Sequence, residues 1–199
     1  RWQVEQTRRA LAARGLMILS GMMATAGEDY STLESIRRTG GLRPDGTWAA
    51  NLASARRHAE IARDLGLPLV TLHAGFLPHD AADPERAGLL ERLRTVAAVF
   101  ADQSVRLGLE TGQESAGTLL AVLDELPAGV GVNFDPANMI LYGMGDPVAA
   151  LDQLAARVVQ VHVKDADPSP TPGQWGTERP AGQGSVDWAA FSAVYHRRG

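Results

Sequence analysis

Three polar residues that could bind a metal ion stand where apolar stretches of the sequence end. Glu110, Asp135 and His162 each close a short run of valine, leucine and similar residues, which is the composition of a buried strand. An unpaired buried carboxylate is strongly unfavourable, so we expect a positive charge among the three. Two carboxylate oxygens and one imidazole nitrogen suit a single divalent cation, and Mn²⁺, Co²⁺, Zn²⁺, Fe²⁺ and Mg²⁺ all stay open.

The same residues have a plainer interpretation as structural groups. Glu110 and Asp135 could cap helices or order loops, and His162 could be a hydrogen-bonded histidine of the core. For any one residue this alternative is as good as the metal site. Three such residues at equivalent positions of successive strands favour the metal site.

A lysine lies two residues beyond the histidine, on the same face of the predicted strand 158–165. Side chains two apart on a strand point to one side, so Gln160, His162 and Lys164 share a face. Lys164 could steady a negatively charged oxygen of a substrate, or pair with one of the two carboxylates. The next residue, Asp165, is expected to orient a neighbouring basic group.

The elements that must position these residues alternate along the chain. Runs of apolar residues predict strands at 16–20, 68–73, 105–110, 130–135 and 158–165. Apolar residues at a helical period and capping residues predict a helix at 2–14 and further helices that begin near Thr47, Asp83, Ser115, Asp146 and Asp187. The long stretch 23–46 is predicted either to cover the site or to be a mobile surface excursion.

This order of elements predicts a parallel sheet wrapped by helices. The strands are apolar rather than alternating, and no hairpin signal separates them. A doubly wound sheet would carry a glycine-rich phosphate fingerprint after its first strand, which the sequence lacks. Polar residues instead recur at strand ends, at His73, Glu110, Asp135 and His162, as in barrels that build sites from several strands. We therefore predict one domain over residues 1–199, an α/β barrel of which the chain holds about five strands.

The amino-acid composition argues against several classes of function. The 199 residues are 45% hydrophobic, and a formal net charge of −4 without a basic stripe disfavours nucleic-acid binding. The absence of cysteine excludes disulfides, thiolate metal ligands and cysteine nucleophiles. No apolar run could span a membrane and no signal peptide is evident, so a cytoplasmic protein without a membrane partner is expected.

Five short segments carry a more specific signal in combination. In chain order they are Leu72-His73-Ala74-Gly75, Leu107-Gly108-Leu109-Glu110, Asn133-Phe134-Asp135-Pro136-Ala137-Asn138, Val161-His162-Val163-Lys164-Asp165 and Gly182-Gln183-Gly184-Ser185-Val186-Asp187-Trp188. With these segments nearly the whole chain resembles the xylose isomerase-like barrel superfamily, specifically its sugar phosphate isomerase/epimerase branch. The resemblance implies a (β/α)8 TIM barrel with one divalent metal ion held by a Glu, an Asp, a His and a further Glu. Glu110, Asp135 and His162 match the first three of these ligands.

The resemblance also implies strands that the sequence does not contain. The fourth ligand of the family lies on a strand after the segment 182–188, and the family barrel begins with a strand ahead of the first helix. We therefore expect the chain to be a fragment that lacks the first strand and the C-terminal strand–helix units.

The implied function is a divalent-metal-dependent isomerase or epimerase acting on a sugar, a sugar phosphate or a related polyol or hydroxy-ketone. A proton would move at the carbon next to a carbonyl, through an enediolate. Glu110 and Lys164 are the expected catalytic residues. The resemblance also implies a second candidate for the proton-transferring carboxylate, the family's further Glu, so the fragment alone is expected to be inactive or nearly so. His73, Asn138, Lys164 and Trp175 are expected to contact the carbohydrate, with Trp175 as a stacking wall in the proline-rich loop 168–183.

The sequence leaves several alternatives for the ligand and the function open. Arg37 and Arg38 are candidates for binding a substrate phosphate. The same barrel could instead carry a metal-dependent lyase or dehydratase, a hydrolase similar to apurinic endonucleases, or a non-catalytic sugar-binding protein. The nuclease group has a histidine where this chain has Asn138, three residues after Asp135, which makes phosphodiester cleavage the weaker alternative. Whether the protein forms a homo-oligomer is also left open.

Overall fold

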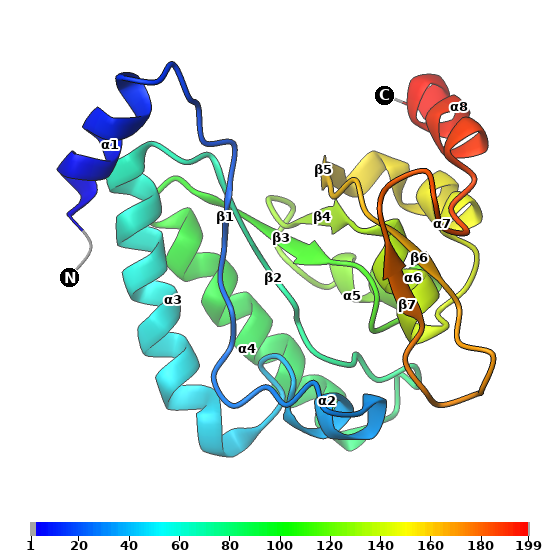
Figure 1. The fold of residues 1–199 in the computed structure, drawn as a ribbon. Coiled ribbons are helices and arrows are strands. Elements are labelled where there is room, and N and C mark those ends of the chain that lie inside the picture. Colours follow the sequence, from blue (N-terminus) through cyan, green and yellow to red (C-terminus); the bar gives the residue numbers. More distant parts are fainter. Residues whose placement is uncertain (1–2, 199) are drawn as a thin grey trace.

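A five-stranded parallel sheet forms the centre of the molecule. The computed structural model describes residues 3–198, so the predicted helix start at Trp2 and the two chain ends lie outside the described residues. The strands follow their chain order across the sheet: β1 (Gly21–Met22), β2 (Leu69–Leu72), β3 (Arg106–Glu110), β4 (Gly131–Phe134) and β5 (Val158–Val161) (Figure 1). All four pairings are parallel, which confirms the predicted sheet.

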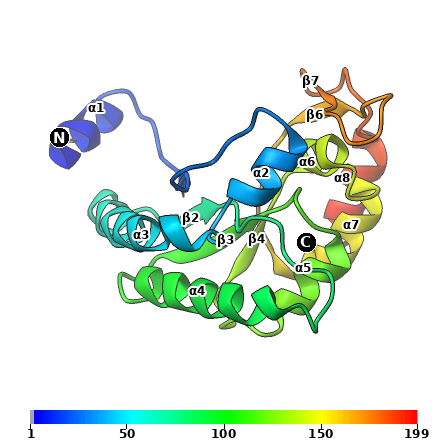
Figure 2. The same cartoon turned by 90° about the horizontal axis from the view of Figure 1, so that it is seen from below.

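Helices precede, connect and follow the strands. They are α1 (Val4–Ala12), α2 (Leu33–Thr39), α3 (Asp45–Leu65), α4 (Pro84–Ala101), α5 (Ala116–Leu123), α6 (Pro136–Tyr142), α7 (Pro147–Leu154), a 3₁₀ turn (Ala155–Arg157) and α8 (Trp188–Arg198). Figure 2 shows α3, α4, α5 and α7 following one another around the sheet. Their inner faces and the strands share one large apolar core, in which Leu93, Val96 and Phe100 of α4 are fully buried. Within the described residues, no helix combines the length and the apolar composition needed to cross a membrane.

The predicted capping residues start their helices as expected. The side chains of Asp83, Ser115, Asp146 and Asp187 accept backbone N–H groups in the first turns of α4, α5, α7 and α8. The prediction for Thr47 is wrong, because α3 begins at Asp45 and the Thr47 hydroxyl donates back to the Pro44 carbonyl within the first turn.

The predicted strand at 16–20 is wrong. Only Gly21–Met22 pairs with β2, and Leu16, Met17 and Leu19 are 59%, 81% and 68% exposed. β1 lies at an edge of the sheet, so the preceding residues have no described strand beside them to bury their side chains. The strand predicted at 158–165 is likewise shorter and only half buried, because β5 forms the other edge and ends at Val161.

An antiparallel hairpin follows β5, against the prediction that the chain contains none. β6 (Asp165–Asp167) pairs with β7 (Thr177–Arg179) inside the stretch predicted as a proline-rich loop. The buried Asp165 carboxylate anchors this region, since it accepts N–H groups from Gly182, Gly184 and the Trp188 indole at 2.9–3.1 Å. The prediction that Asp165 orients a basic side chain is therefore wrong, because its oxygens are taken by these donors.

Two short helices were also not predicted. α2 lies within the stretch 23–46, where the Thr32 side chain forms a capping box with Ser35. α6 starts immediately after β4 at Pro136 and is capped by Asp135. The second of these helices matters for the site, because its first residue follows one of the predicted metal ligands.

Candidate metal centre

The three predicted metal ligands meet at the carboxyl ends of neighbouring strands. Glu110 is the last residue of β3, Asp135 follows β4 and His162 follows β5. One potential ligand atom of each lies within 4.8 Å of the others. His162 Nδ1 is 3.1 Å from Glu110 Oε1 and 3.5 Å from Asp135 Oδ2. Parallel strands place their ends at one edge, which is why residues far apart in sequence converge here.

Asp135 combines the two roles that were considered for it. Its Oδ1 accepts the Asn138 backbone N–H at 2.9 Å and so caps α6, while the Thr111 hydroxyl holds the Asp135 backbone. Its Oδ2 is buried and has no hydrogen-bond donor among the described residues. The nearest positive groups, on His162 and Lys164, lie 3.5 Å away, which leaves this oxygen available to bind a cation.

The groups around this oxygen favour the ionised form of the Asp135 carboxyl group. Burial works against ionisation of Asp135, but His162, the Asn138 N–H and Lys164 outweigh it and hold the pKa of Asp135 below its ordinary value. The carboxylates of Asp135 and Glu110 raise the pKa of His162 to about 9. At 3.5 Å the contact between His162 and Asp135 is a charge interaction rather than a hydrogen bond.

Glu110 is held by amide groups on both of its oxygens. Asn133 Nδ2 donates to Oε2 at 3.0 Å and Asn138 Nδ2 donates to Oε1 at 3.2 Å. His73 Nε2 lies 3.7 Å from Oε1, and the other ring nitrogen of His73 is buried without a partner. The carboxylate is therefore fixed with Oε1 toward the cluster.

Lys164 stands beside the cluster with its ammonium between two carboxylates. Its Nζ is 3.0 Å from Glu178 Oε1, 3.5 Å from Asp135 Oδ2 and 3.4 Å from Asn138 Oδ1. Burial alone would lower the pKa of Lys164, but Asp135 and Glu178 raise it above its ordinary value. Lys164 is thus a fixed positive charge at neutral pH.

A cavity of ≈ 500 Å³ opens above these groups. It is lined by all four residues that were expected to contact the carbohydrate. His73, Asn138, Lys164 and Trp175 line it together with Glu110 and His162. Arg37 and Arg38 do not line it, because the Arg37 guanidinium lies over the Phe76 ring and Arg38 borders a separate surface pocket.

Three lining residues with a polar group were missed by the sequence reasoning. Tyr30 enters from the stretch 23–46, Tyr142 ends α6 with its ring 5.0 Å from Trp175, and Glu178 comes from β7. Covering the site was one of the two alternatives predicted for the stretch 23–46, and this was the one available signal for Tyr30. Nothing local in the sequence marks Glu178, because only the hairpin brings it to Lys164.

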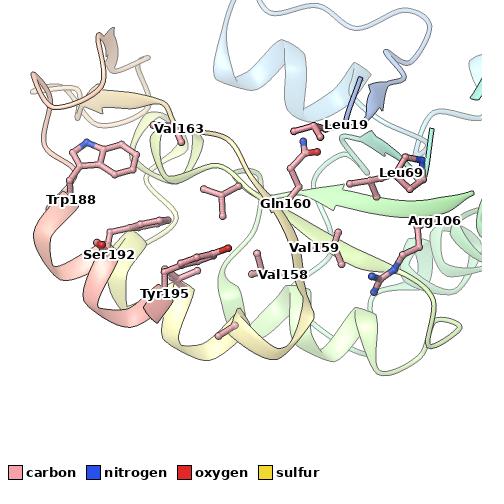
Figure 3. Close-up of a pocket in the computed structure, with 15 residues that line it drawn as sticks. Leu19, Leu69, Arg106, Val158, Val159, Gln160, Val163, Trp188, Ser192 and Tyr195 are labelled. Atoms are coloured by element: carbon pink, nitrogen blue, oxygen red, sulfur yellow. The ribbon is translucent and has the colours of Figure 1, made fainter. Parts of the chain in front are cut away.

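A larger cavity of ≈ 860 Å³ lies between β5 and α8, where Trp188, Ser192 and Tyr195 face the valines of the strand (Figure 3). Arg106 is the charged residue among the described side chains that line it. It is larger than the cavity above Glu110, but it lacks grouped acids, bases or metal ligands. We therefore place the candidate site at the smaller, polar cavity.

Comparisons with known proteins agree with this architecture. Residues 3–199 match the family model described as xylose isomerase-like TIM barrel. The crystal structure of a xylose isomerase domain protein from Planctomyces limnophilus is 33% identical, with a TM-score of 0.93 over 98% of this chain and 73% of that chain. No curated protein matches the chain.

Two more distant structures share the fold. A xylose isomerase-like TIM barrel protein from Mycobacterium smegmatis in complex with magnesium is 19% identical, with a TM-score of 0.72 over 98% of this chain and 68% of that chain. A D-tagatose 3-epimerase-like protein is 15% identical, with a TM-score of 0.72 over 98% of this chain and 71% of that chain. The TIM-barrel class predicted from the strand-end residues is confirmed.

Proposed function

Because the chain belongs to the xylose isomerase-like TIM barrel family, we propose that it is a divalent-metal-dependent isomerase or epimerase acting on a sugar, a sugar phosphate or a related hydroxy-ketone. The observation that carries this proposal is the buried Asp135 Oδ2, which has no hydrogen-bond donor in the described part of the chain and lies in one cluster with Glu110 and His162. The magnesium complex and the epimerase-like protein among the similar structures support it.

Glu110, Asp135 and His162 would hold the cation. They are oxygen and nitrogen donors, so Mn²⁺, Co²⁺, Zn²⁺, Fe²⁺ and Mg²⁺ are all acceptable. When bound, the ion would supply Lewis-acid stabilisation of the negative charge that develops on a substrate oxygen.

The remaining groups serve proton transfer at a carbon next to a carbonyl. Glu110 is a candidate carboxylate to take the proton and return it, because it lines the cavity. The Lys164 ammonium lies 3.4 Å from the Asn138 amide and provides a second positive charge for the developing oxyanion. His73 and Asn138 offer hydrogen bonds to substrate hydroxyls, and Trp175 offers an apolar wall.

Metal content and isotope exchange test the proposal together. The purified chain is loaded with Mn²⁺, freed of excess metal and examined by elemental analysis. Ketoses and aldoses, with and without phosphate, are then followed by NMR in D₂O. We expect one ion per chain, and any exchange of the hydrogen next to the carbonyl should require that ion. Glu110→Gln should reduce both, whereas Glu91→Gln, which removes the same charge from an exposed position on α4, should change neither. A wild-type chain that binds no Mn²⁺ would refute the proposal.

A further inference from the structure

Two side-chain amides lie in register with the Glu110 carboxylate across three neighbouring strands. Glu110 of β3 is paired with Asn133 of β4, and Asn133 is paired with Gln160 of β5. Asn133 is fully buried, and neither amide was considered for a role in the sequence reasoning. Residues directly opposite on adjacent strands have side chains close enough to interact, so the three polar groups form a continuous row beneath the candidate metal centre.

The chemistry of the row fixes the orientation of the Asn133 amide. Asn133 Nδ2 donates to Glu110 Oε2 at 3.0 Å, and Asn133 Oδ1 accepts from Gln160 Nε2 at 3.2 Å. An ionised carboxylate only accepts hydrogen bonds, so Asn133 must turn its NH₂ group to Glu110. The Glu110 carboxylate thus sets the orientation, and the Gln160 NH₂ group satisfies the Asn133 carbonyl oxygen that is turned away from Glu110.

In this arrangement the two carboxylate oxygens of Glu110 have different partners. Oε2 accepts from Asn133 beneath the site, whereas Oε1 accepts from Asn138 at 3.2 Å and lies 3.1 Å from His162 Nδ1. We propose that Asn133 is a positioning residue that presents Glu110 to the metal through one oxygen, and that Gln160 supports it from one step further away by satisfying the Asn133 carbonyl oxygen. The inference rests on the proposed metal-dependent function and adds the residues that set the geometry of its first ligand.

Gln160→Glu is the decisive variant, because two explanations predict opposite signs. A carboxylate at this position cannot donate to Asn133 Oδ1 and competes with Glu110 for the Asn133 NH₂ group, so the hydrogen bond that holds Glu110 Oε2 is weakened or lost. Partners behind a metal ligand typically change affinity by about 10–100-fold, and we expect a weakening of Mn²⁺ binding in this range. A simple through-space charge effect would instead tighten the binding of a cation.

Matched variants distinguish an effect of the hydrogen-bonded row on Mn²⁺ affinity from an effect of added charge. Isothermal titration with Mn²⁺ at pH 8, where the new carboxylate is ionised, measures the affinity. Gln153→Glu places the same charge on an exposed position of α7 and should leave the affinity unchanged. Gln160→Met removes the donor without adding charge and should weaken binding less than Gln160→Glu. Asn133→Leu should weaken it about 10–100-fold, and Gln160→Glu should then cause no further loss in that background.

The outcomes distinguish this inference from the function on which it rests. If Gln160→Glu binds Mn²⁺ as tightly as the wild type or more tightly, and circular dichroism shows a folded chain, the positioning role of the row is refuted. The proposed metal site is not affected by this result. Additive losses in the double variant refute the positioning role as well. If Asn133→Leu fails to fold, the comparison of Gln160→Glu, Gln160→Met and Gln153→Glu still decides the matter. A wild-type chain without Mn²⁺ affinity overturns both proposals.

Discussion

Asp135 accepts the backbone N–H of Asn138 at 2.9 Å through Oδ1, and the same carboxylate keeps Oδ2 buried beside Glu110 and His162 with no donor from residues 3–198. One side chain therefore starts α6 and faces the candidate ion. This relationship explains why a helix begins directly at a strand end, and it ties the geometry of the site to the stability of α6.

Asp135→Asn should separate these two roles. The new amide keeps an oxygen that can cap α6, so the free energy of unfolding of the metal-free chain should change by less than about 1 kcal/mol. Mn²⁺ affinity should fall at least about 100-fold, because a neutral amide replaces an anionic ligand. Urea denaturation and titration calorimetry measure the two quantities.

Asp135→Ala is the matched comparison, since it removes the cap and the ligand together. It should lose the Mn²⁺ affinity and a further ~1 kcal/mol of stability. If Asp135→Asn binds Mn²⁺ as tightly as the wild type, Asp135 is a structural cap only.

Lys164→Met should move metal affinity and activity in opposite directions. Lys164 Nζ lies 3.5 Å from Asp135 Oδ2, so its removal lowers the competing positive charge and should leave Mn²⁺ affinity equal or higher. Isotope exchange at the substrate carbon should fall by about 100-fold or more, because one charge that stabilises the oxyanion is lost. A fall in Mn²⁺ affinity with unchanged exchange would contradict the assigned role.

Asp165→Asn should destabilise the region that carries the hairpin. Asn can offer one acceptor oxygen, whereas Asp165 Oδ2 alone accepts from Gly182, Gly184 and the Trp188 indole. We expect the free energy of unfolding to fall by about 2–4 kcal/mol, with a change in tryptophan fluorescence. Asp167→Asn, which affects an exposed carboxylate on the same strand, should have little effect. Equal effects of the two variants would argue against an anchoring role for Asp165.

Glu114 should make stability fall as pH rises. Its carboxyl is buried, one oxygen has no partner among the described residues, and burial raises its pKa to about 8. Between the ordinary value of 4.5 and about 8 the folded chain binds more protons at this group than the unfolded chain. The contribution of Glu114 therefore falls by roughly 1 kcal/mol per pH unit across that window and is constant above it.

Glu114→Gln removes this titration. Urea denaturation between pH 5 and pH 9 should show that the difference in stability between the variant and the wild type grows in favour of the variant up to about pH 8. A difference that does not vary with pH would mean that Glu114 titrates alike in both states.

The cluster could be predicted from the sequence because strand ends obey a simple rule. Glu110, Asp135 and His162 each follow an apolar run, and parallel strands with helical crossovers bring such positions to one edge. His73, Asn138 and Trp175 were placed in the cavity with the help of the family resemblance. In these cases the local signal and the topology agree.

The remaining features depend on contacts that no local pattern encodes. An apolar run such as 16–20 looks the same whether it lies inside a sheet or at its edge, so hydrophobicity predicted a strand where the structure has exposed side chains. The role of Asp165 depends on donors about twenty residues away, and Glu178 reaches Lys164 only through the β6–β7 hairpin.

A crystal of the chain soaked in Mn²⁺, with data collected at the manganese absorption edge, tests the central claim most directly. We predict one anomalous peak within bonding distance of Glu110, Asp135 and His162, and no peak there in Asp135→Asn. An empty site in the soaked wild-type crystal, with Asp135 Oδ2 bound instead by a protein donor or a water molecule, would contradict the account.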